Sequence, residues 1–137
     1  MTDWFDIHMT PDELQRMSAL GLAHIGDAVY ELLVRSYLCT HGRATGRNLH
    51  HDTVALVCAP AQARAVKTLE CSLTEEELAV FRRGRNAKVS GIPHGATVGE
   101  YHAATGFEAL FGWLWLTGRR NRLNELFSEL MEALHAA

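Results

Sequence analysis

The chain has 137 residues, of which 47% are hydrophobic and 21% are charged, with a formal net charge of −3 at pH 7. This length and composition predict one globular domain over residues 1–137, with a hydrophobic core of its own. The negative net charge excludes a protein that is basic over its whole surface, while a local basic patch stays compatible with it.

Cysteine usage and hydropathy indicate a cytoplasmic protein without a membrane partner. The cysteines Cys39, Cys58 and Cys71 are odd in number and widely spaced, which argues against a disulfide framework or a zinc site and favours reduced thiols. The first six residues are acidic, unlike the start of a signal peptide. The longest apolar run, from Phe107 to Leu116, contains Glu108 and is too short to span a bilayer.

Helix-capping signals follow one another along the chain, and we find no alternating pattern typical of a strand. The first predicted helix is opened by Thr10-Pro11, and the second is capped by Ser18 and runs to about Cys39. The third, Leu49–Cys58, is capped by Asn48, the fourth begins at Pro60, and the fifth is opened by the capping box Thr74–Glu77. The last two cover about Gly99–Thr117 and Asn121–Leu134. The segment Val89–Thr97 contains Gly91, Pro93 and Gly95 and is predicted to be a loop. The expectation is an all-α domain of about six or seven helices.

A glycine–aspartate pair, Gly26-Asp27, interrupts the apolar run from Ala19 to Leu33. Both residues are poor in a helix interior, so this position needs a carboxylate and room beside it, which Gly26 would supply for another helix or for a ligand. The residues that would share the helix face of Asp27 are Leu20, Ala23, His24 and Glu31. Asp27 and Glu31 can share a divalent cation on this face; the alternative is a solvated face where Asp27 is a cap or a salt-bridge partner.

Glu108 is the only ionisable residue from Phe107 to Leu116. A helix that is apolar nearly all round lies in the core or in an interface, where an ionised glutamate is costly unless it is paired or metal-bound. One interpretation is that an arginine neutralises Glu108. The other is that Glu108 meets Asp27 in an all-oxygen site, which suits Mg²⁺ or Mn²⁺ better than zinc.

Residues 82–88 hold the highest density of positive charge in the chain, with four cations and one amide in seven positions: Arg82, Arg83, Arg85, Asn86 and Lys88. Basic residues at a helix C-terminus can alternatively be explained by their favourable interaction with the helix dipole. That explains Arg82 and Arg83 well but Arg85 and Lys88 poorly, so we interpret the segment as a phosphate-binding motif. The weaker cluster at 119–122 is interpreted as surface charge.

Taken in order, three motifs resemble the ribonuclease III family, and most closely its Mini-III branch. They are Ile25–Glu31, Arg82–Lys88 and Phe107–Leu110. The resemblance implies an all-helical homodimer that hydrolyses double-stranded RNA with Mg²⁺, for which Mn²⁺ can substitute, and leaves 5′-phosphate and 3′-hydroxyl ends. For the Mini-III branch it further implies maturation of large-subunit (23S) ribosomal RNA, with a ribosomal protein as a candidate helper, by a catalytic domain without an appended double-stranded-RNA-binding domain.

The resemblance also assigns roles to particular residues. Asp27 and Glu108 correspond to catalytic metal ligands, Glu31 and Thr105 are secondary candidates, and the basic motif 82–88 corresponds to the RNA contact. The larger family carries further carboxylates where this chain has Leu20, Ala23 and Thr105, which argues against a second metal ion. The alternative function is a non-catalytic RNA-binding or ribosome-associated module that keeps the fold.

Overall fold

The computed structural model describes residues 1–42, 46–88, 91 and 94–136, and among these residues it contains helices and turns but no strand. The helices are α1 (Pro11–Arg16), α2 (Ala19–Thr40), α3 (Gly46–Val57), α4 (Ala59–Leu69), α5 (Glu75–Arg85), α6 (Val98–Leu116) and α7 (Arg120–Ala136). The all-α fold predicted from the capping signals is therefore confirmed.

Local capping chemistry sets where four of the helices begin. In each case the N-cap hydroxyl accepts a hydrogen bond from the backbone N–H three residues later, which satisfies one of the unpaired donors at a helix start. The four N-caps are Thr10, Ser18, Thr74 and Thr97. The first three were predicted, and the capping box that Thr97 forms with Glu100 was missed.

Some predicted boundaries differ from the structure. Asn48 lies inside α3, which begins at Gly46, so its predicted role as a cap is wrong. Helix ends commonly shift by one or two residues, because a cap residue is also tolerated in the first turn. Residues 89–90 and 92–93 of the predicted loop lie outside the described residues, and Gly91 and Gly95 have φ values of 85° and 88° that favour glycine.

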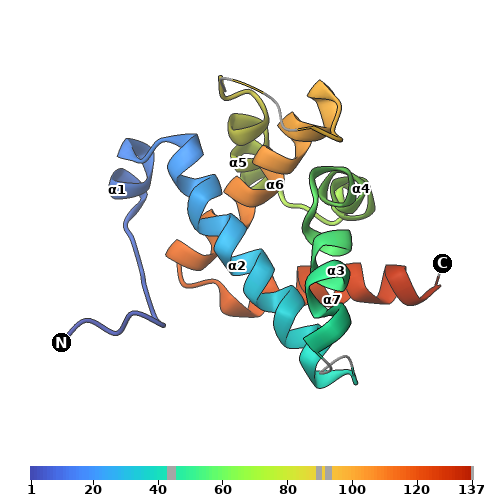
Figure 1. Cartoon of the computed structure of the whole chain (residues 1–137). Coiled ribbons are helices and arrows are strands. Elements are labelled where there is room, and N and C mark those ends of the chain that lie inside the picture. Colours follow the sequence, from blue (N-terminus) through green and yellow to red (C-terminus); the bar gives the residue numbers. More distant parts are fainter. Residues whose placement is uncertain (43–45, 89–90, 92–93, 137) are drawn as a thin grey trace.

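Helix α6 is the centre of the fold, and α2, α4 and α5 pack around it (Figure 1). Its buried side chains include Phe107, Leu110, Phe111 and Leu114, each at most 1% exposed. This agrees with the sequence pattern, because a helix that is apolar on all sides needs neighbours on all sides. Trp113 and Leu116 are also buried within the chain itself, so these side chains leave little apolar surface for a partner.

Glycines allow α2 and α5 to approach α6 at the level of Glu108. A Cβ atom added to Gly26 would overlap the backbone oxygen of Glu108 and would lie 2.8 Å from the nitrogen of Gly112. On the other side of α6, a Cβ at Gly84 would lie 2.6 Å from the Cβ of Ala109. The clearance predicted for Gly26 is therefore confirmed, and the element that uses it is α6.

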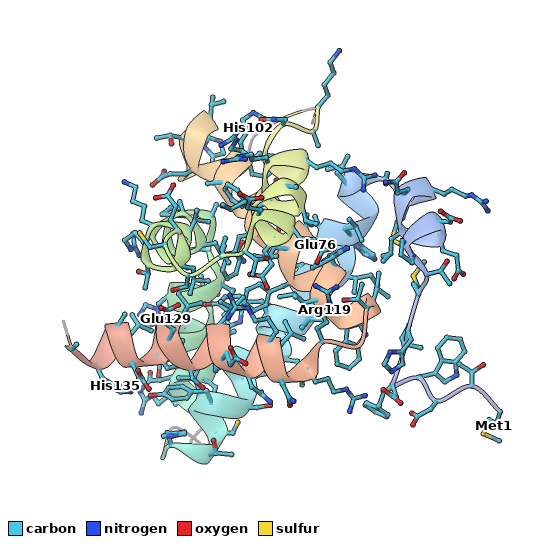
Figure 2. The ribbon with its side chains drawn as sticks, turned by 180° about the vertical axis from the view of Figure 1, so that it is seen from behind. Met1, Glu76, His102, Arg119, Glu129 and His135 are labelled. Carbon is cyan, nitrogen blue, oxygen red and sulfur yellow. The ribbon has the colours of Figure 1, made fainter. Side chains whose placement is uncertain are left out.

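Arg119 and Arg122, at the junction of α6 and α7, form ion pairs between helices, which corrects their interpretation as surface charge. Arg122 forms an ion pair with the buried Glu77 at 2.8 Å and donates to the backbone oxygen of Ser72 at 2.6 Å. Burial alone would raise the pKa of Glu77, but the hydrogen bonds from Arg122 and the Thr74 backbone hold this pKa below its usual range. Arg119 pairs with Glu76 at 2.8 Å, and the two lie close together in Figure 2.

Candidate active site

The structure brings Asp27 and Glu108 together at the crossing of α2 and α6. Gly26 lies directly against the backbone of Glu108, and the next residue along α2 is Asp27. The Asp27 carboxyl is within hydrogen-bonding reach of the Glu108 carboxyl. Asp27 is on the exposed face of α2, whereas Glu108 is half-buried. The predicted pairing of the two carboxylates is therefore present in the fold.

The pair carries an uncompensated negative potential. Burial, together with the hydrogen bond and the repulsion from Asp27, raises the pKa of Glu108 to about 8. Among the described residues, no arginine neutralises Glu108, which removes the support for that alternative there. Among the residues that the structure describes, no lysine, arginine or histidine forms an ion pair with either carboxyl. Without a bound cation, the pair therefore retains a proton near neutral pH.

Sequence reasoning missed a third residue of the site, Gln62 on α4. Its side chain is 1% exposed and its Nε2 donates to the Val57 backbone oxygen at 3.0 Å, while its amide group faces the Glu108 carboxyl and partly offsets the rise in that carboxyl's pKa. Among the described residues, its buried Oε1 has no hydrogen-bond partner. The signal was available, because Gln62 takes a core position on the apolar stripe of α4 that continues with Ala65, Val66 and Leu69.

A pocket of about 440 Å³ leads to Glu108 from the junction of α3 and α4. Gln62 and Glu108 line it together with Cys58, Tyr101 and Ala104. The carboxylate pair can thus be reached from the side of α4 as well as from the exposed face of α2.

The two secondary candidates are engaged elsewhere. Glu31 forms an ion pair with Arg35, one turn further along α2, at 2.8 Å. Glu31 therefore has a basic partner on its own helix. Thr105 is buried, and its hydroxyl donates to the backbone oxygen of Tyr101 at 3.0 Å.

The basic motif 82–88 surrounds the point where α5 packs on α6. Its five polar side chains are all exposed, while Gly84 is buried against the turn of α6 that precedes Glu108. Arg83 also donates from Nη2 to the backbone oxygen of Met17, where α1 ends. Arg85 bonds Asn86 Oδ1 at 3.2 Å and lies 5.7 Å from the Phe81 ring centroid. Arg82 lies in the last turn of α5, and Lys88 follows the end of that helix.

Comparison with known proteins identifies the fold. Residues 20–119 match the ribonuclease III domain. The chain belongs to the ribonuclease III family. A crystal structure of a Fusobacterium nucleatum protein superposes with a TM-score of 0.80 at 28% identity, covering 88% of this chain and 98% of that one.

Curated relatives place the chain in one branch of that family. The Mini-ribonuclease 3 of Clostridium tetani is 41% identical over 85% of this chain and 78% of its own length. That of Symbiobacterium thermophilum is 48% identical over 78% of this chain and 82% of its own length. The chain is therefore a ribonuclease III-type endoribonuclease, and its substrate is RNA. In the part of the chain that the structure describes, every helix is too short or too polar to cross a bilayer.

The oxygen atoms at this ribonuclease site suit a hard divalent cation. Asp27 and Glu108 supply two adjacent carboxylates, and their mutual repulsion is a cost that a cation would remove. Within the described residues, no group of three or more histidine, cysteine, aspartate or glutamate side chains could hold a metal. The two carboxylates would thus fill only part of a coordination shell and leave room for water and a phosphate oxygen, as Mg²⁺ sites usually do.

Proposed function

We propose that this ribonuclease hydrolyses phosphodiester bonds of double-stranded RNA with Mg²⁺, or Mn²⁺ in its place, held by Asp27 and Glu108. The observation that carries the proposal is the carboxylate pair, which lies at an accessible helix crossing without a positively charged partner among the described residues. When bound, the cation would activate a water molecule and stabilise the charge that develops on the phosphate.

The protein's own residues prepare this chemistry. Asp27 and Glu108 come from different helices, so the crossing at Gly26 controls the separation of their carboxyl groups. Because the pKa of Glu108 is raised to about 8, the residue gives up its proton when a cation replaces it. Hydrolysis by an activated water would leave 5′-phosphate and 3′-hydroxyl ends.

The shape and symmetry of duplex RNA support a duplex substrate and a homodimeric enzyme. Double-stranded RNA is recognised largely by its form and its backbone, which the exposed cations of the motif 82–88 would contact. A homodimer with two-fold symmetry would offer one site to each strand. Leu20 and Leu32 are 44% and 57% exposed on α2 and would supply apolar contacts for it.

The biological substrate is inferred from the resemblance to Mini-III enzymes. We infer that the duplex is a stem of the 23S ribosomal RNA precursor, cleaved in the cytoplasm with a ribosomal protein as a helper. Primer extension on precursor RNA, with and without this protein, would locate the cut.

The proposal is tested by incubating the protein with an RNA duplex and with either single strand alone. We expect cleavage of the duplex in Mg²⁺, none in EDTA, and recovery on adding Mg²⁺ or Mn²⁺. Ligation assays on the fragments should report 5′-phosphate ends. Binding of the duplex without cleavage under all of these conditions would instead favour the non-catalytic RNA-binding module.

The basic motif should determine how RNA binding depends on salt. Reversing two charges, with Arg85→Glu and Lys88→Glu together, should weaken duplex binding and lower the slope of log K against log salt by about 2, because each lost phosphate contact no longer releases counterions. Filter binding at several salt concentrations measures the slope.

Lys67→Glu with Arg120→Glu is the matched control, since it makes the same charge change on α4 and α7. We expect this pair to keep the wild-type slope. Equal slopes for both double variants would show that the motif 82–88 contributes only general surface charge.

A further inference from the structure

Gln62 connects three helices beside the carboxylate pair. It lies on α4, its Nε2 donates to the backbone oxygen of Val57 at the end of α3, and the same amide group faces the Glu108 carboxyl on α6 and lowers the pKa of that carboxyl. The side chain is almost fully buried and lines the pocket that leads to Glu108. Gln62 and Glu108 therefore line the same pocket beside the site where the proposed function places the cation.

The Val57 carbonyl determines which end of the amide faces Glu108. If the amide were reversed, Oε1 would point at two acceptors, the Val57 oxygen and the Glu108 carboxylate, and an amide oxygen has no hydrogen to donate. In the observed orientation the amide nitrogen faces both acceptors, and Oε1 is buried without a hydrogen-bond partner among the described residues. Buried polar atoms are rarely left unpaired in proteins, so this orphan oxygen marks a side chain held in place for its donor end.

We propose that Gln62 is a positioning residue that holds the Glu108 carboxylate beside Asp27 for cation binding. This inference rests on the proposed Mg²⁺ site. A glutamate side chain has several rotamers, and without a fixed partner its carboxyl group could point away from Asp27. A fixed N–H donor on the α4 side opposes that rotation, in the way that outer hydrogen bonds orient carboxylate ligands of metals generally.

The test measures Mn²⁺ binding by calorimetry for the wild type and for two variants, Gln62→Met and Gln62→Asn. Methionine preserves the length of the side chain without a donor, and asparagine withdraws the amide from Glu108 while keeping a polar group. We expect the Mn²⁺ dissociation constant to rise about tenfold or more in both variants, because outer-shell partners have effects of that size. The Mg²⁺ concentration that supports half-maximal cleavage should rise in the same direction.

Thr53→Val is the matched control for stability. Thr53 is also buried, and its hydroxyl donates to the backbone oxygen of Leu49 at 2.7 Å, so the variant loses a buried hydrogen bond on the neighbouring α3. A purely structural role for Gln62 would make its variants behave like Thr53→Val, with a lower melting temperature but unchanged Mn²⁺ affinity.

The outcomes separate the inference from the proposed function. If the wild type binds Mn²⁺ and a folded Gln62 variant binds it equally tightly, the positioning role is overturned while the cation site stands. If the wild type does not bind Mn²⁺, the proposed cation site fails and the inference fails with it. Thermal unfolding identifies the folded variants, and Gln62→Asn decides the question if Gln62→Met does not fold.

Discussion

Replacing Asp27 by asparagine should lower the rate of RNA cleavage by about 100- to 1,000-fold, the usual effect of removing one group that stabilises developing charge in a transition state. Asparagine is close in size to aspartate but lacks the negative charge that would hold the cation. Because Asp27 is on the exposed face of α2, the fold should tolerate the change. Single-turnover cleavage of a duplex at saturating enzyme measures the effect on the chemical step.

Glu132→Gln is a suitable control, because it removes one carboxylate from the exposed side of α7. We expect this variant to cleave at the wild-type rate. Higher Mg²⁺ should restore part of the Asp27→Asn activity if the lost charge mainly weakens cation binding. Wild-type cleavage by the folded Asp27→Asn protein would contradict any role of Asp27 at the metal.

Replacing Gly26 by alanine should lower the free energy of unfolding by about 3 kcal/mol or more, at the upper end of the cost of overpacking. The added Cβ would overlap the backbone oxygen of Glu108 and approach the nitrogen of Gly112. Backbone atoms cannot move aside by changing a side-chain rotamer, so α2 and α6 would have to separate. Urea denaturation followed by circular dichroism measures the loss.

Gly99→Ala isolates the effect of the clash from the effect of the residue type. Gly99 also lies in a helix, α6, but a Cβ there would meet no atom within 4 Å. The free energy of unfolding of this control should rise by about 0.5–1 kcal/mol, because alanine is the better helix former. Equal stabilities for Gly26→Ala and the wild type would show that the crossing of α2 and α6 is looser than the structure describes.

Much of the fold is encoded locally and was therefore predictable. A cap such as Ser18 acts on the backbone N–H only three residues away, so its effect can be predicted without knowledge of the rest of the chain. The predicted start of α3 was wrong because an asparagine such as Asn48 is compatible both with a cap position and with the first turn of a helix. The local sequence does not distinguish the two positions.

The two carboxylates could be picked out from the sequence, because each is a charged residue among mostly apolar neighbours. Asp27 follows a glycine in a mostly apolar run, and Glu108 is the one charged residue in an apolar stretch. Such residues carry an energetic cost that function or pairing must offset. Gln62 was missed because its place on the apolar stripe of α4 indicates burial but does not indicate which residue its amide faces.

The sequence by itself determined the helical class, most of the helix starts, the two carboxylates and the need for space at Gly26. Only the tertiary structure decided that α6 fills this space, that Gln62 and Glu108 line one pocket, and that Arg122 forms an ion pair between α7 and the buried Glu77. The physical reason is the range of the interactions. Caps and periodicity act within a few residues of one helix, whereas contacts between helices depend on crossing geometry, which the whole core sets at once.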